Sequence, residues 1–190
     1  MRATIISGSA RENNNSIRVA KALLKLLEKK HTASIIDFRT YDIPLMAQGG
    51  LNKNKLSDFQ KNLIENLSES NIIIMVSPEY NWSITPELLN MFDIFGEVEF
   101  KKLFNNKIFA FVGVSSGKGG KAPCLHLMQI SNKIIGYTQS HSVVSAKIFE
   151  SHFTNNMLDE DGNFTETGEY EIGLNAFVNY TLTMAEIWFR

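Results

Sequence analysis

Several features that mark secreted, membrane-bound or nucleic-acid-binding proteins are missing from this sequence. It has one cysteine, Cys124, so no disulfide can form within the chain, which fits a reducing compartment. Its 19 lysines and arginines are matched by 20 aspartates and glutamates, and the formal net charge of −1 gives no field to attract nucleic acid or an anionic membrane. No apolar run reaches the roughly 18 residues of a membrane-spanning helix, and no signal-peptide pattern opens the chain. We therefore expect a cytoplasmic protein with neither nucleic-acid nor membrane partners.

A metal centre is not indicated either. The four histidines are scattered and show no spacing typical of metal ligands. The acidic segment 159–163 resembles a calcium loop, but counting from Gly162 puts Gly168 where such a loop needs a glutamate. We assign no metal ligand and interpret this segment as a solvated turn.

What the chain does contain is a regular alternation of strand-length apolar runs and helical patterns. Ser57 with Gln60 suits a capping box, Thr85 suits a helix start, and Gly96 and Gly136 suit helix ends. A polar loop is expected between the last strand and the last helix. The predicted strands are 3–7, 33–38, 71–77, 107–114 and 140–146. The predicted helices are 16–30, 57–69, 86–96, 122–135 and 170–189, and the polar loop is 151–168.

This alternation is typical of an α/β fold with a doubly wound parallel sheet. The continuous apolar run in 71–77 suggests burial on both faces, as in the centre of such a sheet. Because parallel crossovers are right-handed, few topologies remain, and five strands suit the flavodoxin-like order 2-1-3-4-5. No repeat or linker divides the chain, so we predict one domain over 1–190.

In a sheet of this order, the ligand lies beyond the carboxyl ends of the strands, where the winding reverses. The loops at that point are 8–16, 77–83 and 114–121. The first loop joins a strand to a helix N-terminus, whose free N–H groups and dipole favour a phosphate, and Arg11 adds a fork-shaped cation. Further donors in this loop are Ser9, Asn14, Asn15 and Ser16. The alternative is a capped turn with a solvent-facing arginine.

The second loop holds two large aromatic residues, Tyr80 and Trp82, in a polar turn. Either ring can form a wall for a flat ligand, although packing within the domain or at a dimer interface is the alternative. The third loop, 115–120, is rich in serine and glycine and permits close backbone approach to a ligand. It does not match a P-loop, because Gly113 to Lys118 is one residue too short. A flexible turn is the alternative here.

At these loops the chain resembles the NADPH-dependent FMN reductase family, whose relatives include quinone, azo and chromate reductases. The family's first motif is similar to G-S-x-R-x-x-S. Here Gly8, Ser9 and Arg11 match it, Asn14 replaces the last serine, and Ser16 stands two residues later.

The family's second motif is similar to P-E-Y-N-G-S. This chain matches it over 78–81 and at Ser83, with Trp82 where glycine is usual. The helix that follows, with Leu88-Leu89-Asn90-Met91-Phe92-Asp93, is similar to the family's L-K-N-A-x-D. The likeness extends over about residues 3 to 146 and includes the Gly- and Ser-rich third loop.

The resemblance implies a flavodoxin-like enzyme that binds FMN and takes NAD(P)H as co-substrate. Hydride would pass from the nicotinamide to FMN and then to a quinone-like, azo, flavin or metal-oxyanion acceptor, with no catalytic side chain assigned. The large side chain of Trp82 narrows the space for the second substrate. The phosphate would be held by Ser9, Arg11, Asn14, Ser16 and the Ile17 backbone. The isoalloxazine would be flanked by Pro78, Glu79, Tyr80, Asn81, Trp82, Ser115, Ser116 and Gly117.

The predicted last helix is more apolar than one buried face requires, which suggests either a subunit interface or a two-sided core helix. The resemblance favours the first reading and a homodimer or homotetramer. Two other functions stay open. One is a flavin-binding electron carrier without nicotinamide reductase activity, although carriers of this fold tend to be strongly acidic. The other is a binding module that has kept the fold without the cofactor.

Overall fold

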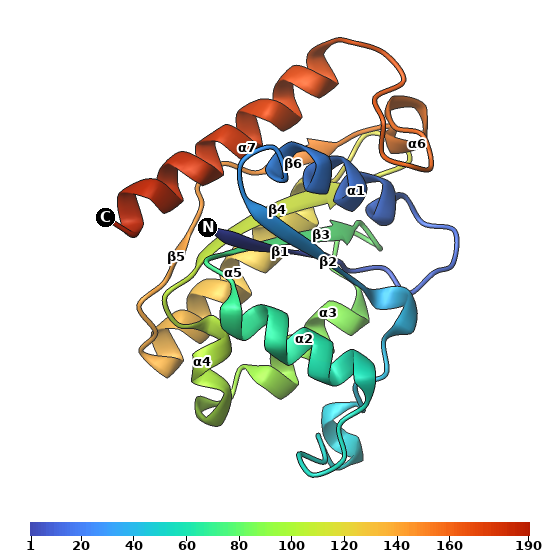
Figure 1. Ribbon diagram of the computed structural model, residues 1–190. Coiled ribbons are helices and arrows are strands. Elements are labelled where there is room, and N and C mark those ends of the chain that lie inside the picture. Colours follow the sequence, from blue (N-terminus) through green and yellow to red (C-terminus); the bar gives the residue numbers. More distant parts are fainter.

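A parallel β-sheet runs through the centre of the chain, whose computed structural model describes residues 1–190 (Figure 1). Its strands are β1 (Arg2–Ser7), β2 (Thr32–Asp37), β3 (Ile72–Pro78), β4 (Ile108–Val114), β5 (Val143–Val144) and β6 (Phe149–Ser151). They are hydrogen-bonded in the order β2-β1-β3-β4-β5, and β6 also pairs with β4. This is the flavodoxin-like order, so the fold prediction is confirmed.

Helices cover both faces of the sheet (Figure 1). α1 and α7 pack on one face, and α2, α3, α4 and α5 pack on the other. The helix bounds are α1 (Asn15–Leu27), α2 (Asp58–Glu69), α3 (Pro86–Phe95), α4 (Lys101–Phe104), α5 (Lys121–Thr138), α6 (Thr154–Met157) and α7 (Glu169–Trp188). Short 3-10 turns are η1 (Phe38–Thr40), η2 (Met46–Gln48) and η3 (Val98–Phe100). No helix combines the length and the hydropathy needed to cross a bilayer.

The central strands are buried on both faces, as their apolar runs predict. In β3, Ile73 and Met75 face the cluster beneath α2, α3 and α5, whereas Ile74 and Val76 face the cluster beneath α1 and α7. This alternation places two cores around one sheet. The sheet is therefore held rigidly, and the loops at its carboxyl edge start from fixed points.

Local capping signals identify several helix ends correctly. The Ser57–Gln60 capping box is present, and the Thr85 side chain accepts a hydrogen bond from the Leu88 amide. Gly96 is the C-cap of α3. These devices use partners within one helical turn, which is why the sequence alone reveals them.

Two helix ends differ from the prediction. α1 ends at Leu27 and not at residue 30. After Leu27 the chain forms a turn, in which the amides of Lys30 and His31 both donate to the Leu27 carbonyl. α5 continues through Gly136 to Thr138, and Gln139 ends it in the left-handed conformation with φ 52°. The amide of Gln139 donates to the Gly136 carbonyl there.

The fifth strand is also not the continuous strand expected over 140–146. It is split into β5, which pairs with Ile108 and Phe109 at the start of β4, and β6, which pairs with Val112–Val114 at its end. The Ser145 amide still donates to the Phe109 carbonyl of β4. The chain then stops pairing with β4 and pairs with it again only at β6. The prediction missed β6 and the one-turn helices α4 and α6, because such short segments carry little periodicity.

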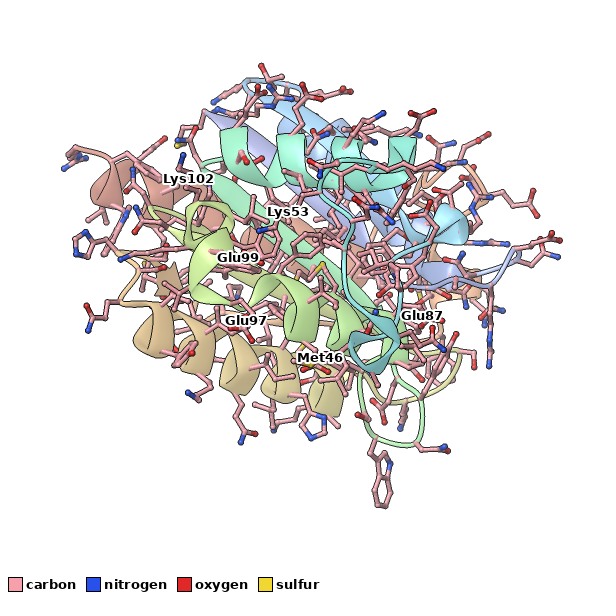
Figure 2. The ribbon with its side chains drawn as sticks, turned by 90° about the horizontal axis from the view of Figure 1, so that it is seen from below. Met46, Lys53, Glu87, Glu97, Glu99 and Lys102 are labelled. Atoms are coloured by element: carbon pink, nitrogen blue, oxygen red, sulfur yellow. The ribbon has the colours of Figure 1, made fainter.

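The segment between β2 and α2 crosses the face of α3. The Met46 amide donates to the Asn90 side chain of α3 at 3.1 Å, and Lys53 pairs with Glu99 beyond the end of α3. Figure 2 shows Met46 beside α3, and Lys53 and Glu99 close together. Two contacts therefore hold this segment against α3 and η3, the two elements that follow loop 77–83.

Candidate functional site

The carboxyl ends of β1, β3 and β4 open into a cavity of about 560 Å³. All three loops singled out in the sequence contribute to its walls. Its lining residues are Ser9, Arg11, Asn13, Asn14, Asn15, Pro78, Glu79, Tyr80, Asn81, Val114, Ser115 and Ser116. The chain therefore brings together polar groups from distant segments at the winding reversal of the sheet.

Four of the predicted site residues do not line this cavity. Ser16 is fully buried, and Ile17 lines an adjoining polar cavity of about 470 Å³ on the other side of the first loop. Trp82 is 80% exposed, and Gly117 lies outside the cavity wall. The assigned cofactor set missed Val114, because as the last residue of an apolar strand it gives no polar signal. It also missed Asn13 and Asn15 on either side of the assigned Asn14, although Asn15 was noted as a donor of this loop.

The first loop ends in a well-formed N-terminus of α1. Asn14 is the N-cap, and its Oδ1 accepts from the Ile17 amide at 2.9 Å while its Nδ2 donates to the Arg11 carbonyl at 2.6 Å. The Ile17 amide thus already has a partner within the chain. The remaining first-turn amides and the helix dipole keep this end positive.

Ser16 lies in the first turn of α1, and its Oγ has no hydrogen-bond partner although the residue is fully buried. An unpaired buried hydroxyl costs about 1–3 kcal/mol. Such groups are rare in folded proteins, and a bound ligand is one of their explanations. The donor chemistry of this helix N-terminus, a hydroxyl and free first-turn amides with Arg11 in the preceding loop, fits a phosphate group.

Tyr80 joins the first and second loops. The Arg11 guanidinium lies 4.4 Å from the centre of its ring, and its hydroxyl is 3.3 Å from the Ser9 Oγ. A cation over an aromatic face is an attractive arrangement. These contacts hold the two loops against each other in the wall of one cavity.

The second loop closes in a tight turn between Tyr80 and Ser83. The Tyr80 amide donates to the Ser83 carbonyl at 3.0 Å, and the Ser83 amide donates to the Tyr80 carbonyl at 2.9 Å. The two central residues, Asn81 and Trp82, have φ of 51° and 62°. Thr85 then secures the loop, because its hydroxyl donates to the Gly8 carbonyl at 2.7 Å.

The third loop is held from two sides. The Glu79 carboxylate accepts a hydrogen bond from the Gly120 amide at the start of α5, and the His152 Nδ1 accepts from the Gly119 amide at 3.1 Å. Gly113 and Gly120 are in backbone contact, since a Cβ on Gly113 would lie 1.7 Å from the Gly120 oxygen. Loop 115–120 is therefore a supported turn. The role of His152 could not be found from the sequence, because it lies 33 residues beyond Gly119.

The lone cysteine lies behind this site and takes no part in it. Cys124 is fully buried in α5, and burial raises the pKa of its thiol to about 12. A thiol in this state is a poor nucleophile at neutral pH. Cys124 therefore packs within a helix.

A family model described as NADPH-dependent FMN reductase matches residues 1–150 of the chain. The chain belongs to this family. A "Probable NADPH:quinone oxidoreductase 2" from Oryza sativa subsp. japonica is 23% identical over 168 residues, which cover 87% of this chain and 80% of the rice protein. The family resemblance seen in the three loops is confirmed, and the chain is a flavoprotein of the oxidoreductase class.

Solved structures of similar fold include two named flavoproteins. FerB from Paracoccus denitrificans, described as a flavoenzyme NAD(P)H:(acceptor) oxidoreductase, superposes with a TM-score of 0.74 at 18% identity, covering 98% of this chain and 97% of FerB. A flavodoxin from the domain Archaea gives a TM-score of 0.61 at 16% identity, with 100% of both chains covered. At these identities the likeness shows the fold that the FMN reductase family shares.

Proposed function

We propose that this protein is an NAD(P)H-dependent FMN oxidoreductase that passes hydride from a nicotinamide to bound FMN and then electrons to a small acceptor. Membership of the NADPH-dependent FMN reductase family supports FMN as cofactor and NAD(P)H as co-substrate. The observation that carries the assignment to this cavity is the meeting of polar residues from the loops after β1, β3 and β4 at the positive end of α1. The buried, unpartnered hydroxyl of Ser16 in the first turn of α1 adds to it.

The FMN phosphate fits the first loop. Ser9, Arg11 and Asn14 line the cavity, and Ser16, outside the cavity wall in the first turn of α1, carries a buried hydroxyl that no protein group uses. Charge-assisted hydrogen bonds to a phosphate are stronger than neutral ones, and the helix dipole adds to them. The Ile17 amide is held by Asn14, so we assign it to the cap of the helix rather than to the phosphate.

The second and third loops suit the ring system. Pro78, Glu79, Tyr80 and Asn81 line the cavity together with Ser115 and Ser116. When bound, FMN supplies the hydride and electron chemistry, and the chain holds, orients and shields it. Because the Glu79 carboxylate is bonded to Gly120, it shapes the third loop and is not a free base in the cavity. No side chain is assigned as a proton donor.

The name of the rice relative, a probable NADPH:quinone oxidoreductase, favours a quinone-like acceptor among the candidates, which also include azo compounds, free flavin and metal oxyanions. A flavin-binding electron carrier is the alternative function. The net charge of −1 argues against it, because docking to a redox partner usually relies on a strongly charged surface. NADPH-driven reduction of a quinone by the purified protein separates the two.

The test begins with the absorption spectrum of the purified protein and its response to NADPH. We expect a flavin spectrum, present on purification or restored by added FMN, that bleaches with NADPH and returns with a quinone. Protein that stays colourless in excess FMN contradicts the proposal. If the flavin spectrum is present but neither NADPH nor NADH bleaches it, the result supports the electron-carrier function instead.

A matched pair of variants tests the phosphate site. Ser16→Ala and Ser131→Ala each remove a buried hydroxyl that has no partner, but Ser131 lies in α5 outside the cavity. We expect Ser16→Ala to weaken FMN binding roughly tenfold to a hundredfold, since one charge-assisted hydrogen bond is lost, and Ser131→Ala to leave it unchanged. Titration of the flavin fluorescence measures both. Equal FMN affinities in the two variants would remove Ser16 from the site.

The oligomeric state stays a prediction. α7 exposes Ile172, Tyr180, Ile187 and Trp188 on its outer side, which supports the proposal of a homodimer or homotetramer. Sedimentation of the purified protein measures this directly. The cytoplasmic location likewise stays a prediction.

A further inference from the structure

Trp82 adopts a backbone conformation that its side chain does not favour. It is the second central residue of the Tyr80–Ser83 turn, and its φ of 62° lies in the left-handed region. Turns with two left-handed central residues favour Asn-Gly, because glycine has no Cβ to clash. Asn81 suits the first position, whereas the indole of Trp82 replaces the expected glycine at the second.

Nothing within the chain offsets this strain. Trp82 is 80% exposed, the largest exposed fraction among the large apolar side chains. Its ring takes part in none of the aromatic pairs or cation–π contacts of the structure. An exposed tryptophan in a strained position is therefore unexplained by folding and points to a role toward a ligand.

The turn is fixed on both sides and presents Trp82 beside the cavity. Tyr80 and Asn81, the two residues before it, line the cavity, and Tyr80 is anchored by Arg11 and Ser9. On the other side, the Ser83 Oγ is 3.2 Å from the His126 Nδ1 of α5. Trp82 therefore directly follows two cavity-lining residues in a turn that is held in place, and its indole is exposed to solvent.

We propose that Trp82 is a specificity-determining residue, whose indole stacks on a flat aromatic acceptor and so favours quinone-like molecules over compact acceptors. The inference rests on the proposed function. Offset stacking of aromatic rings needs a large π-face beside the ring-binding cavity, and the exposed indole of Trp82, next to the cavity residues Tyr80 and Asn81, offers one. A compact inorganic acceptor has no flat ring and gains nothing from it.

The test compares two acceptors in three proteins. The ratio of kcat/KM for a naphthoquinone to kcat/KM for ferricyanide is measured with NADPH for the wild type, Trp82→Gly and Trp82→Phe. We expect the ratio to fall about threefold to tenfold in Trp82→Gly, chiefly through a higher KM for the quinone, and to be largely retained in Trp82→Phe. Tyr137→Ala, which removes an exposed ring at the far end of α5, is the control and is expected to keep the ratio.

Other outcomes overturn the inference. A ratio that is unchanged in Trp82→Gly shows that the indole does not discriminate between acceptors. A fall for both acceptors together, with a lower sedimentation coefficient, assigns Trp82 to a subunit interface instead. If the wild type does not bind FMN, the proposed function fails and this inference with it. If the wild type binds FMN and reduces both acceptors, the proposed function holds, and the kcat/KM ratios of the variants then test Trp82 alone.

Discussion

At the scale of single residues, the site combines groups that stabilise the fold with groups that do not. Asn14 caps α1 and Thr85 joins the second loop to the first, so both contribute to the folded chain without any ligand. Ser16 and Trp82 do the opposite. One leaves a buried hydroxyl unpaired and the other holds a bulky side chain at positive φ. Residues that weaken local stability in this way are expected at functional sites.

The strain at Trp82 predicts a stability gain on its removal. Trp82→Gly is expected to raise the free energy of unfolding by about 1 kcal/mol, because glycine adopts a φ of 62° freely and little burial is lost. For a chain of this length, that corresponds to a rise in Tm of roughly 2–4 °C. Thermal unfolding followed by circular dichroism, without added FMN, measures it. A lower Tm would mean that the indole is packed in solution.

At the scale of elements, glycines show which boundaries are decided by tertiary contacts. Gly113 and Gly120 allow β4 and the start of α5 to touch, and that contact closes the third loop beside the cavity. Gly136, although it looks like a helix end in the sequence, lies within α5 and has no atom near the position of a Cβ. The same residue type therefore has opposite roles at the two ends of this helix.

The same substitution should have opposite effects at these positions. Gly136→Ala is expected to stabilise the protein by about 0.5–1 kcal/mol, because alanine is the better residue in a helix interior. Gly113→Ala is expected to destabilise it by about 3 kcal/mol or more, since the added Cβ would overlap the Gly120 carbonyl. Urea unfolding of the two variants gives both values. Loss of stability in Gly136→Ala would show that α5 ends where the sequence suggested.

At the scale of the whole molecule, the two ends of the parallel strands have different roles. The carboxyl ends carry the polar cavity, whereas buried polar contacts close the amino ends. There Lys107 is almost fully buried before β4, and its ammonium donates to the carbonyls of Ser68 and Ser70 at the end of α2. Burial lowers the pKa of Lys107 to about 8.

This lowered pKa predicts how stability varies with pH. In the unfolded chain Lys107 titrates near 10.5, so between pH 8 and 10.5 the unfolded state binds more protons, and the contribution of Lys107 to stability rises with pH. It is fully present above pH 10.5 and is lost as pH falls through 8. We expect Lys107→Met to flatten the rise that urea unfolding shows over this range. Lys55→Met, at an exposed lysine, is the control and should keep the wild-type slope.

Much of the fold could be predicted from the sequence, because strands and capped helices depend on neighbours within a few residues. The buried run of β3, the capping box at Ser57 and the Thr85 cap are local patterns, and their alternation implied the sheet order. The order in turn located the three loops of the site, since the carboxyl ends of parallel strands share one edge. Ser9, Arg11 and Tyr80 followed from that placement.

Only the tertiary structure decided the features that depend on distant partners. The split of the fifth strand into β5 and β6 follows from pairing with β4, and the support of Gly119 by His152 joins residues 33 positions apart. The left-handed backbone of Trp82 follows from a turn closed by its neighbours and held by His126. Local periodicity encodes burial and capping, but it carries no information about which remote atom will meet a given side chain.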